Sequence, residues 1–194
     1  MGRSHIKPIA QPDETSCGPA ALKHALSVFN SRKSLQVLTK ITKTNRNGTT
    51  TKNMLKAITT LGYSVLLVEY ATLKHVQSAL KYKANQPRAV LVSYLYSEGP
   101  DSGHWAMVSS FLSSKRRIVL LDSYSGKKKS YDWPDFRLRW KDYDLKRRKA
   151  NENDERLFTL VRRWQPQLLM IIARKADDLP KFKITSSKLF TPLK

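Results

Sequence analysis

The stretch Gln11-Pro12-Asp13-Glu14-Thr15-Ser16-Cys17-Gly18-Pro19-Ala20-Ala21-Leu22 decides how this chain is interpreted. Prolines oppose a helix before it, whereas apolar residues recur at helical spacing from Ala21 to Phe29. We therefore expect a helix over residues 17–29, with Pro19 in the first turn, where its missing N–H does no harm. Cys17, the single cysteine, then stands at the start of that helix.

The position of Cys17 allows two interpretations. The helix dipole and the free N–H groups of a first turn favour the thiolate, which is the nucleophilic form of cysteine. A lone cysteine is also commonly a small buried apolar residue. The local sequence leaves both open, but a single cysteine excludes an intramolecular disulfide and a thiolate metal cluster.

A thiolate nucleophile needs a base, and the chain has 4 histidines. His24 would lie about 10.5 Å along the helix axis from the sulfur, which is beyond hydrogen-bond reach. His5 and His75 are expected on the surface, in the N-terminal segment and on the polar side of a helix. His104 differs because it opens an apolar strand and follows Gly103, which has no side chain. His104 is therefore the candidate base.

Two further residues complete a constellation. Asp122 ends an apolar strand over residues 117–122, and it would face His104 in a hairpin whose turn centres near Ser113. A register shift of one residue would put the two on opposite faces unless a β-bulge corrected it. Gln11, which alone would be a surface glutamine, carries an amide that can donate to an oxyanion together with the backbone N–H of Cys17.

In chain order these residues resemble a known family. The matching stretches are Gln11, Cys17-Gly18-Pro19-Ala20-Ala21-Leu22, Gly103-His104-Trp105-Ala106-Met107-Val108 and Leu121-Asp122. They resemble the bacteriocin-processing (double-glycine leader) cysteine peptidases and their free-standing relatives, in the papain-like superfamily. The resemblance covers roughly residues 6–136.

The resemblance implies a role for each of these residues. Cys17 would be the nucleophile and His104 the general base, with Asp122 orienting the imidazole and Gln11 lining the oxyanion hole. Gly103 and Trp105, on either side of His104, would bind substrate. Ser123 stands where the family commonly has a proline after its aspartate. No cofactor or metal is expected.

The order of predicted elements indicates an α+β fold, with N-terminal helices packed on a mostly antiparallel sheet. With the resemblance, this predicts a papain-like cysteine peptidase domain over residues 1–140. Residues 141–194 would be a basic C-terminal extension that includes a last strand near residues 168–174. Residues 137–163 are expected to form a mixed-charge exposed helix or a loop, and residues 175–194 a loosely held polar tail.

Composition keeps a second function open. The chain has 194 residues, 40% of them hydrophobic, with 36 Lys+Arg against 15 Asp+Glu and a net charge of +21. The motifs favour a thiol hydrolase that cleaves a peptide or isopeptide bond in a peptide or protein substrate. The charge favours a basic module on the same scaffold that binds nucleic acid or an acidic protein with little or no catalysis. No apolar run reaches membrane-spanning length and no secretory signal is visible, so a cytoplasmic location is expected.

Overall fold

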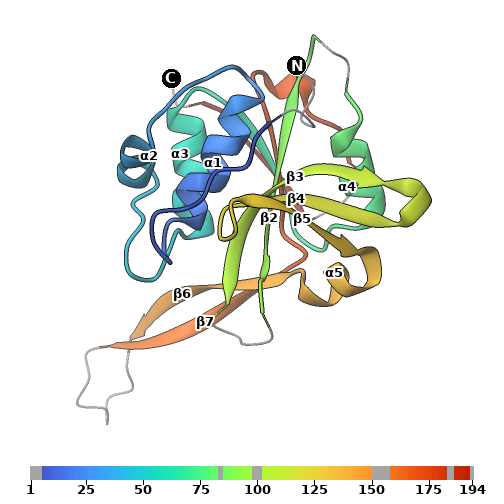
Figure 1. Cartoon of the computed structure of the whole chain (residues 1–194). Helices are drawn as coiled ribbons and strands as arrows, with labels where there is room; N and C mark the ends of the chain where they lie inside the picture. Colours follow the sequence, from blue (N-terminus) through green and yellow to red (C-terminus); the bar gives the residue numbers. More distant parts are fainter. Residues whose placement is uncertain (1–5, 83–84, 98–101, 150–157, 183–185, 193–194) are drawn as a thin grey trace.

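The computed structural model describes residues 6–82, 85–97, 102–149, 158–182 and 186–192. Within these residues, seven strands form one antiparallel sheet in the order β5-β4-β3-β2-β8-β1-β9 (Figure 1). In that order the strands are β5 (Lys127–Asp132), β4 (Arg117–Asp122), β3 (Gly103–Leu112), β2 (Arg88–Leu95), β8 (Leu169–Ala173), β1 (Ser64–Val68) and β9 (Ser187–Phe190). The α+β architecture predicted from the sequence is confirmed.

Helices cover both faces of this sheet (Figure 1). One face packs against α1 (Cys17–Ser27), α2 (Leu35–Ile41) and α3 (Thr51–Thr60), and the other against α4 (Leu73–Leu80) and α5 (Trp133–Arg139). Neighbouring strand residues point to opposite cores: Leu91 lies with the first group of helices and Val92 with the second. Strands buried on both faces form continuous apolar runs, as β1 and β8 do.

The C-terminal part of the chain supplies a central strand. The strand expected near residues 168–174 is β8, which lies between β2 and β1 with all five residues buried. A further strand, β9, pairs with β1. The expectation of a loosely held tail is therefore wrong for residues 187–190, because their backbone groups bond to the edge of the sheet. Residues 169–173 and 187–190 are thus strands of the main sheet.

A separate hairpin extends from the body of the protein (Figure 1). It consists of β6 (Lys141–Lys149) and β7 (Phe158–Pro166), which pair antiparallel. The exposed helix or loop expected over residues 137–163 is therefore wrong for residues 141–149 and 158–163, which are strands, and residues 150–157 lie outside the described residues. At the base of the hairpin, Asp142 accepts a hydrogen bond from the Ser93 hydroxyl, and Asp144 accepts one from the Thr51 N–H at 3.1 Å. These long-range bonds anchor the strands to the body.

A loop before α3 lies directly on the start of α1. The Trp105 indole N–H donates to the Thr49 carbonyl oxygen at 2.9 Å, which holds the loop in place. The side chain of Thr49 approaches Gly18 so closely that a Cβ on Gly18 would lie 2.5 Å from Thr49 Cβ. Glycine at position 18 therefore permits the contact between the loop and the residue that follows Cys17.

We expect Gly18→Ala to lower the free energy of unfolding by about 1–3 kcal/mol, because the added methyl group overlaps Thr49. Thr49→Gly in the same chain should recover part of that loss, since it removes the overlapping atoms. Urea unfolding of the two single variants and the double variant measures this coupling. Strictly additive effects would contradict the close approach.

Candidate active site

The turn before α1 is held by Asp13. Its carboxylate accepts hydrogen bonds from the Ser16 hydroxyl at 2.8 Å and from the backbone N–H and hydroxyl of Thr15 at 2.9 and 2.8 Å. These hydrogen bonds lower the pKa of Asp13 and fix the chain where it enters the helix. Cys17 is the first residue of α1, 6% exposed, and it lines a cavity at the molecular surface.

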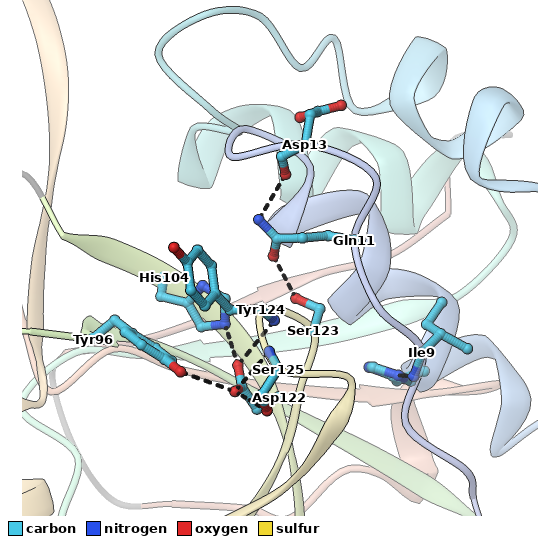
Figure 2. A network of polar contacts seen from close by, with 10 residues as sticks. Ile9, Gln11, Asp13, Tyr96, His104, Asp122, Ser123, Tyr124 and Ser125 are labelled. Carbon is cyan, nitrogen blue, oxygen red and sulfur yellow. Dashed lines mark hydrogen bonds and ion pairs between the residues drawn. The ribbon is translucent and has the colours of Figure 1, made fainter.

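His104 lies near the start of β3 and pairs with Asp122 at the end of β4. His104 Nε2 and Asp122 Oδ1 are 3.0 Å apart, and the exposed fraction of the two side chains is only 5% and 0% (Figure 2). The contact is an ion pair when the imidazole is protonated. The rings of Tyr94 and Tyr96 pack edge-on against the imidazole, with centroids 5.7 and 5.1 Å away.

A β-bulge brings this pair onto one face of the sheet. The register is Ser110↔Val119 on the turn side of the bulge and Val108↔Leu120 on the other side. Continued without the bulge, the turn-side register would place Asp122 opposite Met107, on the face away from His104. Ser109, the extra residue, shifts the register by one and returns Asp122 to the face of His104. The predicted need for such a correction is met, although the two residues are diagonal rather than directly opposite.

The Asp122 carboxylate has further donors around it. Its oxygens accept hydrogen bonds from the Ser125 hydroxyl at 2.6 Å, from the N–H groups of Tyr124 and Ser125 at 3.1 and 3.2 Å, and from the Tyr96 hydroxyl at 3.2 Å (Figure 2). Burial disfavours the charged form, but His104 and these hydrogen bonds outweigh burial and keep the pKa of Asp122 well below its usual range. The carboxylate is therefore ionised at neutral pH.

The protonation of His104 follows from the same contacts. Burial by itself disfavours the imidazolium, but the contacts with Asp122 and with the Cys17 side chain outweigh burial and raise the pKa of His104 to about 9. The structure thus brings Cys17, His104 and Asp122 together, from α1, β3 and β4. At neutral pH this arrangement presents a cationic imidazole to the sulfur.

Gln11 lies on the segment before α1 and bonds to the residue after Asp122. Its side-chain N–H donates to the Asp13 carbonyl oxygen at 2.7 Å, and its side-chain oxygen accepts from the Ser123 hydroxyl at 2.8 Å (Figure 2). The backbone N–H of Gln11 also donates to the Ser123 carbonyl oxygen at 2.8 Å. Ser123, which stands where the resembling family commonly has a proline, therefore orients the Gln11 amide.

The other histidines have structural contacts. His24 is buried, and its Nε2 accepts a hydrogen bond from the Ile9 N–H at 3.0 Å, tying the N-terminal segment to α1. Burial lowers the pKa of His24 to about 4, so its imidazole stays neutral. His75 accepts from the Thr72 N–H at the start of α4. His5 lies outside the described residues.

A cavity of about 680 Å³ extends from Cys17 toward the β6–β7 hairpin. Gly103 and Trp105, the residues expected to bind substrate, both line it. The wall beside Gly103 is Asp142, and a Cβ on Gly103 would lie 2.9 Å from Asp142 Cγ. Burial raises the pKa of Asp142 to about 6, against the opposing hydrogen bonds from Ser93 and the Tyr143 N–H.

Sequence reasoning missed three groups at the site: Tyr96, Ser125 and Asp142. Ser125 follows Asp122 by three residues, and this spacing is typical of an aspartate that caps a turn, so a signal was available. Tyr96 and Asp142 reach the site only through the tertiary fold.

In the part of the chain that the structure describes, no three histidine, cysteine or carboxylate side chains are grouped so that they could hold a metal ion. Among the same residues, no helix combines the length and the apolar character needed to cross a membrane.

Comparison with known protein families matches residues 5–152 to the family described as the Peptidase C39 family. A search of curated protein sequences gives no match. The peptidase domain of Streptococcus ComA, a bi-functional ABC transporter involved in a quorum sensing pathway, has 20% identity and a TM-score of 0.62, covering 88% of this chain and 100% of that one. A double glycine motif protease from an AMS/PCAT transporter, solved in complex with the leader peptide, has 14% identity and a TM-score of 0.59, covering 89% and 94%. These likenesses confirm the predicted papain-like fold.

The raised pKa of His104 predicts how stability depends on pH. A group whose pKa is higher in the folded state than in the unfolded state stabilises the fold, and this contribution is complete at pH values below the unfolded pKa. For His104 the unfolded pKa is about 6.5, and the contribution is lost as the pH rises through about 9. We expect the free energy of unfolding of the wild type to fall over this interval, and to fall less in Asp122→Asn. Urea unfolding at several pH values measures the slope.

Asp132→Asn serves as the matched control, because it removes an exposed ion pair with Arg117. Its slope should equal that of the wild type. If the free energy of unfolding of Asp122→Asn depended on pH as steeply as that of the wild type and of Asp132→Asn, Asp122 would have no role in holding the proton on His104.

Proposed function

The chain belongs to the Peptidase C39 family and is a cysteine peptidase, and we propose that it hydrolyses a peptide bond by forming a thioester on Cys17. His104 acts as the acid and base of this reaction, and Asp122 orients it. What supports the proposal is the geometry: Cys17 lines the cavity and contacts His104, whose Nε2 is 3.0 Å from Asp122 Oδ1.

The first half of the reaction forms the acyl-enzyme. The Cys17 thiolate adds to the carbonyl carbon of the substrate, and His104 gives its proton to the amine nitrogen as the C–N bond breaks. The amine product leaves and the acyl group remains on sulfur. Asp122 keeps the imidazole ring in the orientation that both proton transfers require.

The second half releases the acyl group. His104, now neutral, takes a proton from water while the water oxygen attacks the thioester carbon. The C–S bond breaks, the carboxyl product leaves, and the thiolate and imidazolium are restored. Each addition step places negative charge on the carbonyl oxygen. We assign the stabilisation of this charge to the backbone N–H of Cys17 and the side-chain amide of Gln11.

The cavity supports a peptide as the substrate. At about 680 Å³ it has room for several residues, and Gly103 and Trp105 line it together with Cys17. The similar double glycine motif protease was solved with a leader peptide. We therefore assign to Gly103 and Trp105 the binding of the residues next to the scissile bond.

Alkylation tests the nucleophile directly. We expect iodoacetamide to modify Cys17 near pH 6 roughly tenfold faster than free cysteine, which is almost fully protonated at that pH. His104→Ala should slow this reaction because it removes the imidazolium, whereas His75→Ala should not. Mass spectrometry of the modified chain gives the rates. A rate equal to that of free cysteine from about pH 5 to pH 8 would leave no activated thiolate.

Activity tests the oxyanion assignment, on peptides identified by substrate profiling. Cys17→Ala should abolish turnover, and Gln11→Ala should lower kcat about a hundredfold, with little change in KM. Ser123→Ala should lower kcat by only a few fold, because it loosens the Gln11 amide without removing it. If Gln11→Ala kept the kcat of the wild type, the Gln11 amide would not belong to the oxyanion hole.

A further inference from the structure

The β6–β7 hairpin forms one wall of the cavity that holds Cys17. Five of its residues on one face line that cavity: Tyr143, Leu145, Arg147, Phe158 and Leu160. They share a face because directly paired residues of an antiparallel ladder point the same way, as Arg147↔Leu160 shows. We call these five residues the cavity face of the hairpin. β7 lies outside the residues that match the family.

The cavity face leaves apolar side chains in contact with solvent. Phe158 is 41% exposed and Leu160 57%, although both line a cavity. Apolar side chains clustered on a projecting element beside a binding cavity are typical of a docking surface. A strand of nine residues spans about 30 Å, so a bound segment could follow the hairpin well beyond the scissile bond.

The exposed charge at this end of the cavity is positive. The guanidinium of Arg147 lies over the Phe158 ring, 4.5 Å from its centroid, and both side chains are exposed. Arg46, on the loop before α3, is a second exposed arginine that lines the cavity. The carboxylates of Asp142 and Asp144, at the base of the hairpin, are already held by Ser93 and Thr51. The exposed carboxylate of the cavity, Glu14, lies on the segment before Cys17.

We propose that the cavity face of the hairpin binds a segment of the peptide substrate that carries acidic and apolar side chains. The proposal rests on the proposed function and assigns a second recognition site to it. Phe158 and Leu160 would cover the apolar side chains, and Arg147 and Arg46 would pair with the acidic ones. A peptide fits this surface better than a nucleic acid, because the cavity continues from the hairpin to Cys17.

Two double variants separate this face from general attraction to a basic protein. Arg147→Glu with Leu160→Glu changes the cavity face. Arg148→Glu with Val161→Glu makes the same chemical changes on the opposite face of the same two strands, where both residues are also exposed. Both variants are made in the full chain with Cys17→Ala, so that binding is measured without turnover. Thermal unfolding shows that each is folded, and Arg147→Gln with Leu160→Ser replaces the first pair if it is not.

The probes are two fluorescein-labelled peptides of about ten residues, roughly one strand in length, in which leucine alternates with glutamate or with lysine. A single-stranded oligonucleotide of similar charge is the third probe. At low salt we expect the glutamate peptide alone to bind firmly in fluorescence anisotropy. The cavity-face variant should weaken that binding about tenfold or more, and the opposite-face variant less than about twofold.

Equal losses in the two variants would overturn the proposal, because they would show attraction to net charge alone. Equal binding of the two peptides would overturn it as well. So would tighter binding of the oligonucleotide that the cavity-face variant abolishes, which would make the hairpin a nucleic-acid surface. None of these outcomes depends on catalysis, whose failure would appear separately as unreactive Cys17.

Discussion

The ion pair between His104 and Asp122 is the interaction on which the site depends. Asp122 is fully buried, and a buried carboxylate without partners is strongly unfavourable. Its partners come from the residue after β2, from β3 and from the turn after β4, so the contacts that satisfy the charge also fix the imidazole. The bulge at Ser109 is part of the same arrangement, because it turns Asp122 to the face of His104.

The strand that carries His104 is supported by residues distant in the chain. β3 pairs with β2, which in turn pairs with β8 from the C-terminal part. The base of the β6–β7 hairpin meets the same region, since Asp142 accepts from Ser93 on β2 and lies against Gly103 on β3. The C-terminal residues therefore shape both the sheet under the site and the wall of its cavity.

The role of the positive charge depends on where the basic residues lie in the structure. The net charge of +21 by itself favoured a basic binding module, whereas the motifs favoured an enzyme. On the hairpin, basic and apolar residues share the face that lines the cavity of Cys17, so these residues and the proposed nucleophile line the same cavity. Under the proposal made above, binding at this face serves the peptidase.

The sequence alone determined the features that depend on neighbouring residues. Helical spacing after Cys17 predicted α1, apolar runs predicted strands from β1 to β4 and β8, and the order of motifs predicted the family. Only the tertiary structure decided the register that brings Asp122 to His104, the pairing of residues 141–149 with 158–166, and the pairing of residues 187–190 with β1. The reason is physical: these segments are polar, and the hydrogen bonds that stabilise them, such as Thr51 to Asp144, join residues far apart in the chain, which no local pattern encodes.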